Sequence, residues 1–220
     1  MTDTDSPNKP KSNRGALGFS KADTIQELLQ GNRDWVAKIK AETPEFFSSL
    51  AEGQSPKFLW IGCSDSRVPA SEITNQLPGS IFVHRNIANL VLDSDFNLLS
   101  VLHFSLYTLK IRDIVVVGHR RCGGITAALS HDDFGFIEGW IGSIRNLSRI
   151  HAAKLKALQS DEERVNLLCE LNVKQQITNL ENIHFVRDVV SQGEEIRLHG
   201  WVYDVSDGLI HQVIKRHIVD

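Results

Sequence analysis

Two short, largely apolar runs, residues 57–61 and 113–117, constrain the fold of this chain more than any other feature. Their lengths and their successive apolar positions are typical of strands buried on both faces of a parallel sheet. Helices cover such sheets, and the loops beyond the carboxyl ends of neighbouring strands meet at a crevice where ligands bind. The sequence therefore predicts an α/β fold with a central, mostly parallel β-sheet flanked by helices.

Each run is followed by side chains that bind soft metals. Cys63, Asp65 and Arg67 follow the first run, and His119 and Cys122 follow the second. Two thiolates and one imidazole suit zinc, and three protein ligands leave a fourth tetrahedral position for water, substrate or a nearby carboxylate. We therefore expect Cys63, His119 and Cys122 to hold one Zn²⁺ per chain, with Asp65 as the nearby carboxylate.

Gly123 and Gly124 directly follow the last of these ligands. The sequence predicts a sharp turn with positive φ at this pair, whose backbone N–H groups could also face an oxyanion. The alternative is that Cys63 and Cys122 are inert core cysteines, because free Cys is among the most buried residue types. Their place at strand ends, among charged residues, favours the metal. Cys169 lies in a predicted helix and is expected to serve packing alone.

Start signals predict four helices after residue 20. They are an amphipathic first helix capped by Thr24 and Glu27, a short second helix starting at Thr43 and Pro44, an apolar helix after Asp95, and a helical region from Ser160 to about residue 190. The first two predict an N-terminal helical arm. Residues 195–203 and 209–214 predict a C-terminal β-hairpin.

The helix after Asp95 is apolar on nearly all sides. It therefore carries more apolar surface than one core face uses. Either it lies deep in the core or it also serves a subunit interface.

Composition predicts a single enzyme domain over residues 21–220 and a disordered polar tail over residues 1–20. The chain has 220 residues, is 41% hydrophobic and 23% charged, and has a formal net charge of −3. Basic residues are dispersed among acidic ones, which disfavours a nucleic-acid partner. The apolar runs are shorter than the ~20 residues that span a membrane. With three cysteines, two of them better used as ligands, we expect a reducing compartment, the cytoplasm.

Cys-x-Asp-x-Arg at residues 63–67, followed by His-x-x-Cys-Gly at residues 119–123, resembles the β-class carbonic anhydrases. The resemblance also covers residues 60–68, 82–89, 117–124 and 199–208. It implies the β-carbonic anhydrase fold and the reversible hydration of carbon dioxide to bicarbonate and a proton. It also implies a homodimer or a homotetramer formed as a dimer of dimers, which favours the interface role for the apolar helix.

The resemblance and the residues together predict a mechanism. Zinc lowers the pKa of a bound water towards ~7. Asp65 would accept the proton of that nucleophile and orient it, while Arg67 holds the carboxylate bidentately away from the metal. In an inactive state Asp65 would itself be the fourth zinc ligand. The alternative for Asp65 and Arg67 is an ordinary surface ion pair.

Three further residues resemble the allosteric, bicarbonate-regulated (type II) bacterial subgroup of this class. Trp60, Arg85 and Tyr203 match its bicarbonate pocket. A guanidinium can bind the anion bidentately, and the indole N–H and phenol O–H can add donors. This predicts regulation by pH and bicarbonate. The alternative is that Trp60 and Tyr203 are core aromatics and Arg85 is a structural ion-pair partner.

Rival functions use the same ligand types. A nucleobase deaminase is disfavoured because its His-x-Glu and Pro-Cys-x-x-Cys pattern is absent. A zinc hydrolase acting on a related small linear substrate, such as carbon disulfide, stays open. So does a structural-zinc binding module in which Asp65 closes the site.

Overall fold

The computed structural model describes residues 21–220. The chain divides after Gly53 into two compact units, and every candidate site residue lies in the second, which starts at Gln54. The disordered tail predicted for residues 1–20 lies outside the described residues. The single domain predicted for residues 21–220 stays a prediction.

The first unit contains α1 (Ile25–Glu42), which begins with the predicted capping box. The Thr24 hydroxyl accepts a hydrogen bond from the Glu27 N–H, and the Glu27 carboxylate accepts one from the Thr24 N–H, each at 3.2 Å. This reciprocal pair satisfies two of the free N–H groups at the start of a helix. The predicted first helix is therefore confirmed.

The second helix, α2 (Phe46–Ala51), begins later than Thr43 and Pro44 predict. Thr43 instead ends α1, because its N–H donates to the carbonyl of Ile39 at 2.7 Å. Residue Glu45 then precedes the first turn of α2. The predicted second helix therefore exists, but its predicted start was wrong.

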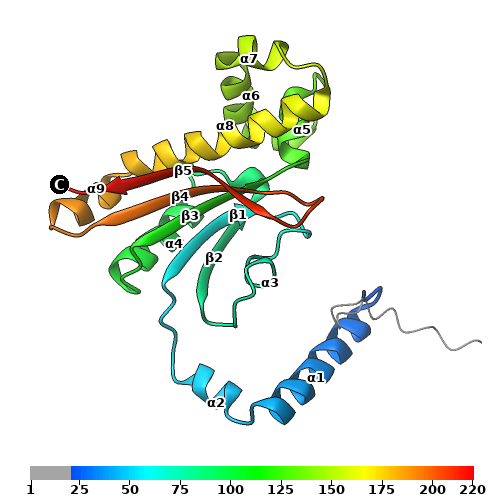
Figure 1. Ribbon diagram of the computed structural model, residues 1–220, viewed down its shortest axis with the longest axis vertical. Coiled ribbons are helices and arrows are strands. Elements are labelled where there is room, and N and C mark those ends of the chain that lie inside the picture. The colour runs from blue at the N-terminus through cyan, green and yellow to red at the C-terminus, as the bar shows by residue number, and fades with distance from the viewer. Residues whose placement is uncertain (1–20) are drawn as a thin grey trace, which may run out of the picture. The chain divides into compact units, whose positions relative to one another are not determined.

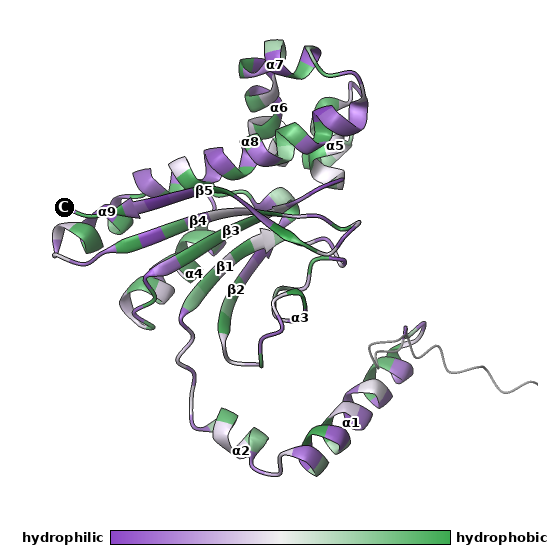
Figure 2. Cartoon of the chain, in the orientation of Figure 1, coloured by the Kyte–Doolittle hydropathy of each residue, from purple (hydrophilic) through white to green (hydrophobic). Residues whose placement is uncertain are grey.

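The second unit is built on a five-stranded sheet of order β2-β1-β3-β4-β5 (Figure 1). The first four strands are parallel and β5 is antiparallel to β4, so the mostly parallel sheet and the C-terminal hairpin are confirmed. The strands are β1 (Phe58–Cys63), β2 (Ile81–Asn86), β3 (Asp113–His119), β4 (Ile196–Tyr203) and β5 (Ile210–Ile218). In Figure 2 the central strands are largely apolar along their length, as burial on both faces requires.

Helices pack against both faces of this sheet. One face carries the largest core cluster, in which Leu59, Ile114 and Leu198 meet three helices. These helices are α4 (Phe96–Tyr107), α8 (Asp161–Asn182) and α9 (His184–Ser191). The opposite face buries Trp60 and Val115 beneath the short α3 (Ala70–Ile73).

A further cluster lies beyond the carboxyl ends of the strands. Here three helices pack with the first half of α8, around Cys63 and Cys122. They are α5 (Gly123–Leu129), α6 (Glu138–Ile150) and α7 (Ala152–Lys156), stacked beside the end of the sheet in Figure 1. Two single 3₁₀ turns, η1 (Ile87–Asn89) and η2 (Gly135–Ile137), complete the unit. The candidate ligands thus lie where the sheet meets this helical cluster.

The helical region predicted to run from Ser160 to about residue 190 is two helices. Ser160 begins α8 with the expected capping box, but Ile183 is extended and separates α8 from α9. The change of direction lets Phe185, Val186 and Val189 pack on the core beside α4. None of the helices within residues 21–220 is long and apolar enough to cross a membrane.

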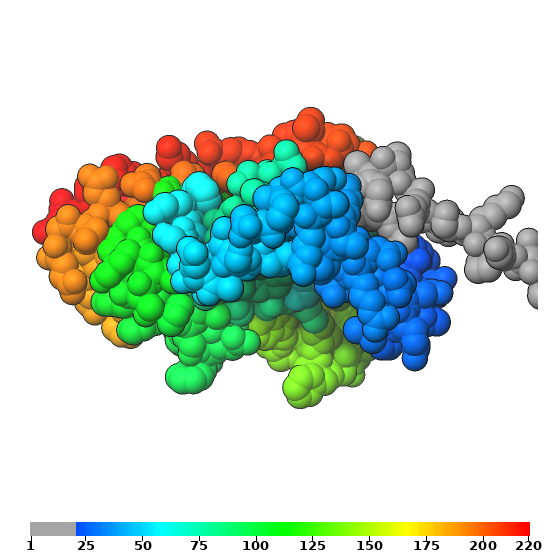
Figure 3. All heavy atoms as spheres, turned by 90° about the horizontal axis from the view of Figure 1, so that it is seen from below, coloured from blue at the N-terminus to red at the C-terminus, as the bar shows by residue number. Residues whose placement is uncertain are grey.

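The apolar helix predicted after Asp95 is α4, and Asp95 is its N-cap. It buries Leu98 and Leu102 in the core but leaves Phe96 83% and Phe104 42% exposed. Atoms of this part of the chain reach the surface seen in Figure 3, in green. One side of α4 is therefore in the core of this chain, and apolar side chains remain outside it.

Candidate metal centre

The three predicted zinc ligands come together at the carboxyl end of two adjacent strands. Cys63 is the last residue of β1 and His119 the last of β3, and these strands pair directly in parallel. Cys122 follows the turn after β3 and precedes α5. The two sulfur atoms are 4.0 Å apart, and the three ligand atoms lie within 4.8 Å of one another. All three side chains are buried.

The histidine is oriented for a metal. His119 Nδ1 lies 3.1 Å from the carbonyl of Arg120, so the tautomer that donates from Nδ1 leaves a lone pair on Nε2. That Nε2 atom is buried without a hydrogen-bond partner among the described residues. A buried polar atom left unpaired is costly, and a backbone carbonyl on the second ring nitrogen is the usual arrangement of a metal-binding histidine. The donor set therefore fits zinc.

The two thiols share one hydrogen bond and differ in acidity. The pKa of Cys63 is lowered to about 4, chiefly because the Cys122 thiol donates to its sulfur. The pKa of Cys122 is raised well above its usual range by that same bond and by burial. Backbone N–H groups of Asp65 and Ala88 also donate to the Cys63 sulfur, the latter at 3.4 Å. Cys63 is thus surrounded by donors that favour a thiolate.

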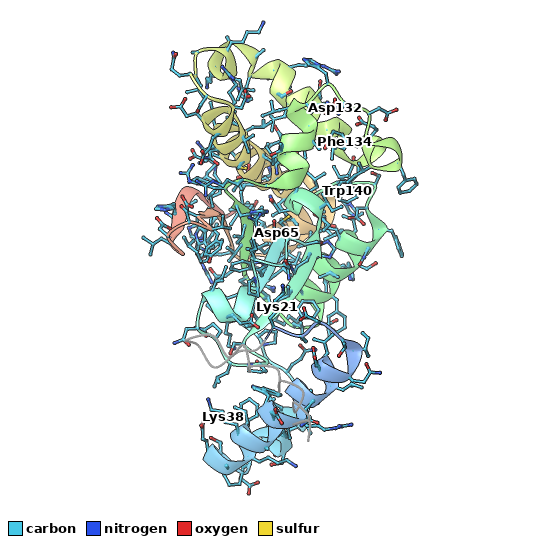
Figure 4. All side chains as sticks on the ribbon, turned by 90° about the vertical axis from the view of Figure 1, so that its right-hand side faces the viewer. Lys21, Lys38, Asp65, Asp132, Phe134 and Trp140 are labelled. Carbon is cyan, nitrogen blue, oxygen red and sulfur yellow. The ribbon has the colours of Figure 1, made fainter. Side chains whose placement is uncertain are left out.

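Asp65 is held beside this group by Arg67. The Arg67 guanidinium donates from Nε to Oδ1 at 2.9 Å and from Nη2 to Oδ2 at 2.7 Å, and its backbone N–H donates to Oδ1 at 2.9 Å. These bonds hold the pKa of Asp65 well below its usual range. Asp65 Oδ2 is 3.7 Å from His119 Nε2, and Figure 4 shows Asp65 near the ends of the central strands. The carboxylate is therefore close to the ligand group while it is paired with arginine.

The turn predicted at Gly123 and Gly124 is different in the structure. Neither glycine has positive φ; the left-handed residue is Arg121, with φ 56°. Both glycines form the first turn of α5, so their helical conformation does not require glycine. Gly124 is instead needed for close packing, since a Cβ there would lie 2.9 Å from a methyl group of Ile87. The predicted oxyanion role of Gly123 and Gly124 stays a prediction.

The three residues of the predicted bicarbonate pocket lie on one face of the sheet. Trp60 is buried, and its indole N–H has no partner among the described residues. A Cβ on Gly62 would lie 2.3 Å from that nitrogen, so only glycine leaves room for this ring. Arg85 pairs in register with Gly62, and Tyr203 packs in the same cluster as Trp60.

Arg85 is not free in this arrangement. Its Nε donates to the carbonyl of Cys63 at 2.7 Å, and its Nη2 donates to the carbonyl of Asp65 at 2.5 Å. The guanidinium therefore holds the loop that carries both the candidate ligand Cys63 and the Asp65 carboxylate. Among the described residues, no acidic side chain forms an ion pair with Arg85, and its guanidinium donates to backbone carbonyls instead.

The sequence analysis missed several residues around the ligands. Ala88 donates its N–H to Cys63, and Asn172 and Gln176 hold the Ala88 segment from α8. The available signal was two amide residues at helical spacing on an otherwise apolar face. Cys169 is buried as predicted, but its sulfur also accepts the N–H of Cys122, and burial raises its pKa to about 12.

Comparison with known proteins gives consistent similarities. The family described as carbonic anhydrase matches residues 58–210. A carbonic anhydrase of Emericella nidulans is 43% identical over 199 residues, which cover 90% of this chain and 87% of that protein. A carbonic anhydrase of Pseudomonas aeruginosa is 35% identical over 194 residues, covering 86% and 85%.

Solved structures agree with these sequence matches. One of the tetrameric β-carbonic anhydrases of Sordaria macrospora superposes with a TM-score of 0.85 at 36% identity, covering 89% of this chain and 100% of that one. The Coccomyxa β-carbonic anhydrase in complex with acetazolamide gives 0.84 at 35% identity, covering 90% and 89%. The family match spans all three metal-ligand candidates and the Asp65–Arg67 pair.

Proposed function

The chain belongs to the carbonic anhydrase family and has the fold of its β class. From this premise we propose that its metal centre hydrates carbon dioxide reversibly to bicarbonate and a proton, under control by pH and bicarbonate. The observation that carries the first part is the convergence of two thiols with a buried, unpartnered His119 Nε2. Three ligands of these types leave one position of a tetrahedral zinc ion open.

Each side chain has a separate task. Cys63, His119 and Cys122 would hold the zinc ion, which when bound lowers the pKa of water towards ~7. Asp65 would accept a hydrogen bond from the attacking water and fix its direction towards the small, apolar substrate. Arg67 keeps the carboxylate ionised and prevents it from becoming a fourth ligand, because it occupies both oxygens.

A stopped-flow assay of carbon dioxide hydration tests this function, with zinc content measured on the same sample. We expect one zinc per chain and fast hydration. Zinc-loaded protein that does not hydrate carbon dioxide would contradict the proposal. Hydrolysis of carbon disulfide in its place would support the related-substrate alternative, and inactivity towards both would support a structural-zinc module.

The regulatory part of the proposal concerns Trp60, Arg85 and Tyr203. Two observations support it: the Trp60 indole N–H is buried without a partner, and Arg85 donates to carbonyls of the catalytic loop. Bicarbonate bound to the Arg85 guanidinium would compete with those carbonyls, so the loop carrying Asp65 would be released towards the metal. The anion selects this closed state through its higher affinity for it. Higher pH favours the open state, since hydroxide competes with the carboxylate.

Substitution in the pocket tests the regulation separately from catalysis. Tyr203→Phe removes only a hydroxyl donor, and Trp60→Phe removes the indole N–H together with part of the ring, so we expect weaker inhibition by bicarbonate and a flatter pH profile in both. Trp201→Phe is the control, because this ring lies 6.4 Å from Trp60 but is not a predicted donor. Unchanged bicarbonate sensitivity and pH profile in the first two variants would mean that the pocket is not regulatory.

We also propose that the chain assembles as a dimer or a tetramer of paired dimers. The support is the exposed apolar surface of α4, which includes Phe96 and Phe104, and the tetrameric state named for the Sordaria macrospora proteins. Sedimentation at micromolar concentration tests this assembly. A compact species of 24.7 kDa would contradict it.

A further inference from the structure

Three amide side chains form a hydrogen-bonded ladder along the buried side of α8. Asn172 and Gln176 are buried, and Asn179 is half-buried one turn further on. Gln176 donates to Asn172 Oδ1 at 2.8 Å, and Asn179 donates to Gln176 Oε1 at 3.0 Å. We call these three residues the amide ladder. Amides buried on an apolar helix face are costly unless all their groups are paired, so the ladder needs a specific partner.

The partner is the backbone of residues 88–91. Asn172 donates to the carbonyl of Ala88 at 2.9 Å. Gln176 accepts the N–H of Val91 at 2.8 Å, and Asn179 donates to the Val91 carbonyl at 2.9 Å. One helix face therefore fixes both ends of a four-residue segment that follows β2.

Part of this segment has a backbone conformation that alanine does not favour. Ala88 has φ 62°, in the left-handed region where its Cβ causes strain, and the next residue, Asn89, has φ 49° in the same region, which asparagine tolerates better. Asn86 adds a second constraint, because its side chain bonds both the N–H and the carbonyl of Leu90 at 2.8 Å. Strained backbone of this kind persists only where the surroundings enforce it.

The strained conformation directs one N–H group at the metal centre. Ala88 is fully buried, and its N–H points at Cys63 Sγ, 3.4 Å away. Such a bond orients a thiolate and withdraws charge from it, as outer partners of metal ligands do. The connection from the ladder to the sulfur runs through one residue. The Asn172 side chain holds the Ala88 carbonyl, and the N–H on the other side of the same Cα donates to Cys63 Sγ.

We infer that the amide ladder positions Cys63 for its metal by holding the Ala88 N–H against the sulfur. Asn172 and Gln176 are positioning residues in this scheme and touch neither metal nor substrate. The inference rests on the proposed zinc site. The competing interpretation is that the ladder only attaches residues 88–91 to α8 and contributes to stability alone.

Measurements of zinc affinity distinguish these two interpretations. Asn172→Leu keeps the branched shape of the side chain but removes the donor to Ala88 and the acceptor for Gln176. Gln176→Glu keeps an acceptor for Val91 but loses the donor to Asn172. We expect Asn172→Leu to lower zinc affinity about 10–100-fold, measured by competition with a chelator. The cobalt(II)-substituted protein should show a shifted thiolate-to-metal charge-transfer band, and amide exchange over residues 88–91 should accelerate. Gln176→Glu should change each of these less.

Ile177→Val is the matched control. Ile177 is fully buried on the same helix and packs on the sheet instead of the ladder, so its truncation weakens α8 without removing an amide. We expect this variant to keep wild-type zinc affinity and cobalt spectrum. If it changes them as much as Asn172→Leu does, the effect is general packing and the inference is wrong.

Zinc binding by the wild-type protein shows whether a negative result counts against the inference or against the proposed function. Wild type that binds no zinc would overturn the proposed function. Wild type that binds zinc, with Asn172→Leu folded and unchanged in affinity and spectrum, would overturn the inference alone. If Asn172→Leu does not fold, Gln176→Glu decides, and wild-type zinc affinity and charge-transfer band in that variant would overturn the inference.

Discussion

An aspartate, an arginine and a histidine lie together at each end of β3, but the two clusters have different chemistry. At its carboxyl end, Asp65 is paired bidentately with Arg67, and its Oδ2 is 3.7 Å from His119 Nε2. At the amino end, Asp113 accepts from both Nε and Nη2 of Arg197, and its Oδ1 is 3.1 Å from the Nε2 of His199, on β4.

The difference lies in the histidine and in its neighbours. His199 Nε2 is close enough to donate a hydrogen bond to Asp113, so that cluster satisfies itself. His119 Nε2 is buried and unpartnered, its other nitrogen is held by a carbonyl, and two thiols face it. An aspartate, an arginine and a histidine therefore do not define a catalytic site. The unsatisfied nitrogen and the sulfur atoms distinguish the carboxyl end.

The largest expected effect is the loss of the metal when a thiol is removed. Cys63→Ser replaces a soft thiolate by a hydroxyl that stays protonated at neutral pH, so we expect most zinc and all hydration activity to disappear. Elemental analysis of the purified protein measures this directly. Asp113→Asn, at the opposite end of β3, should keep full zinc. A fully loaded Cys63→Ser protein would show that the carboxyl-end cluster is not the zinc site.

The arginines of the two clusters provide the next comparison. Arg67→Ala frees the Asp65 carboxylate, which lies close enough to the ligand group to become a fourth ligand. We expect folded protein with full zinc and nearly no hydration activity, by zinc analysis and stopped flow together. Arg197→Ala should retain wild-type turnover. Turnover at the wild-type level in Arg67→Ala would mean that the Asp65–Arg67 pair is only structural, like the Asp113–Arg197 pair.

The sequence was sufficient to predict what depends on pattern and local chemistry. Two apolar runs predicted adjacent parallel strands, and their ends bring Cys63 and His119 together as expected. The capping boxes at Thr24 and Ser160 are formed as predicted. These features depend on nearest neighbours along the chain or on strand periodicity, both of which are visible in one sequence.

What depended on packing between distant segments was not predictable. Nothing local marks Ala88 as left-handed, because the amide ladder of α8 and the contact with Gly124 enforce that conformation. The break at Ile183 similarly follows from how α9 packs beside α4. The positive φ assigned to Gly123 and Gly124 occurs instead at Arg121, whose N–H is bonded to Asn166 on α8.

A smaller effect is expected on stability at the amino end of β3. Arg197→Ala removes the bidentate partner of Asp113, and because the arginine is partly exposed we expect a loss of about 1 kcal/mol in the free energy of unfolding. Urea denaturation of the zinc-loaded protein measures it. A loss of activity larger than the loss of folded protein would show that the two ends of β3 are coupled.

The smallest expected effect is on the pH dependence of stability. Hydrogen bonds from Arg197, and less so from His199, lower the pKa of Asp113 in the folded chain relative to about 3.9 in the unfolded chain. A lowered folded pKa means that the unfolded chain takes up the proton first as pH falls. The stabilisation by Asp113 is therefore complete above about pH 4 and is lost as pH falls below that value through the folded pKa.

Asp113→Asn removes this titration. Comparing this variant with wild type isolates the contribution of Asp113, because acid release of zinc affects both proteins alike. We expect the free energy of unfolding of wild type to exceed that of Asp113→Asn by up to about 1 kcal/mol near neutrality. The difference should stay constant in urea titrations from pH 6 to about pH 4 and shrink between about pH 4 and about pH 3, since protonated Asp113 resembles asparagine. A difference that stays constant over this range would mean that the Asp113 cluster contributes through shape and not through charge, unlike the Asp65 pair at the other end of β3.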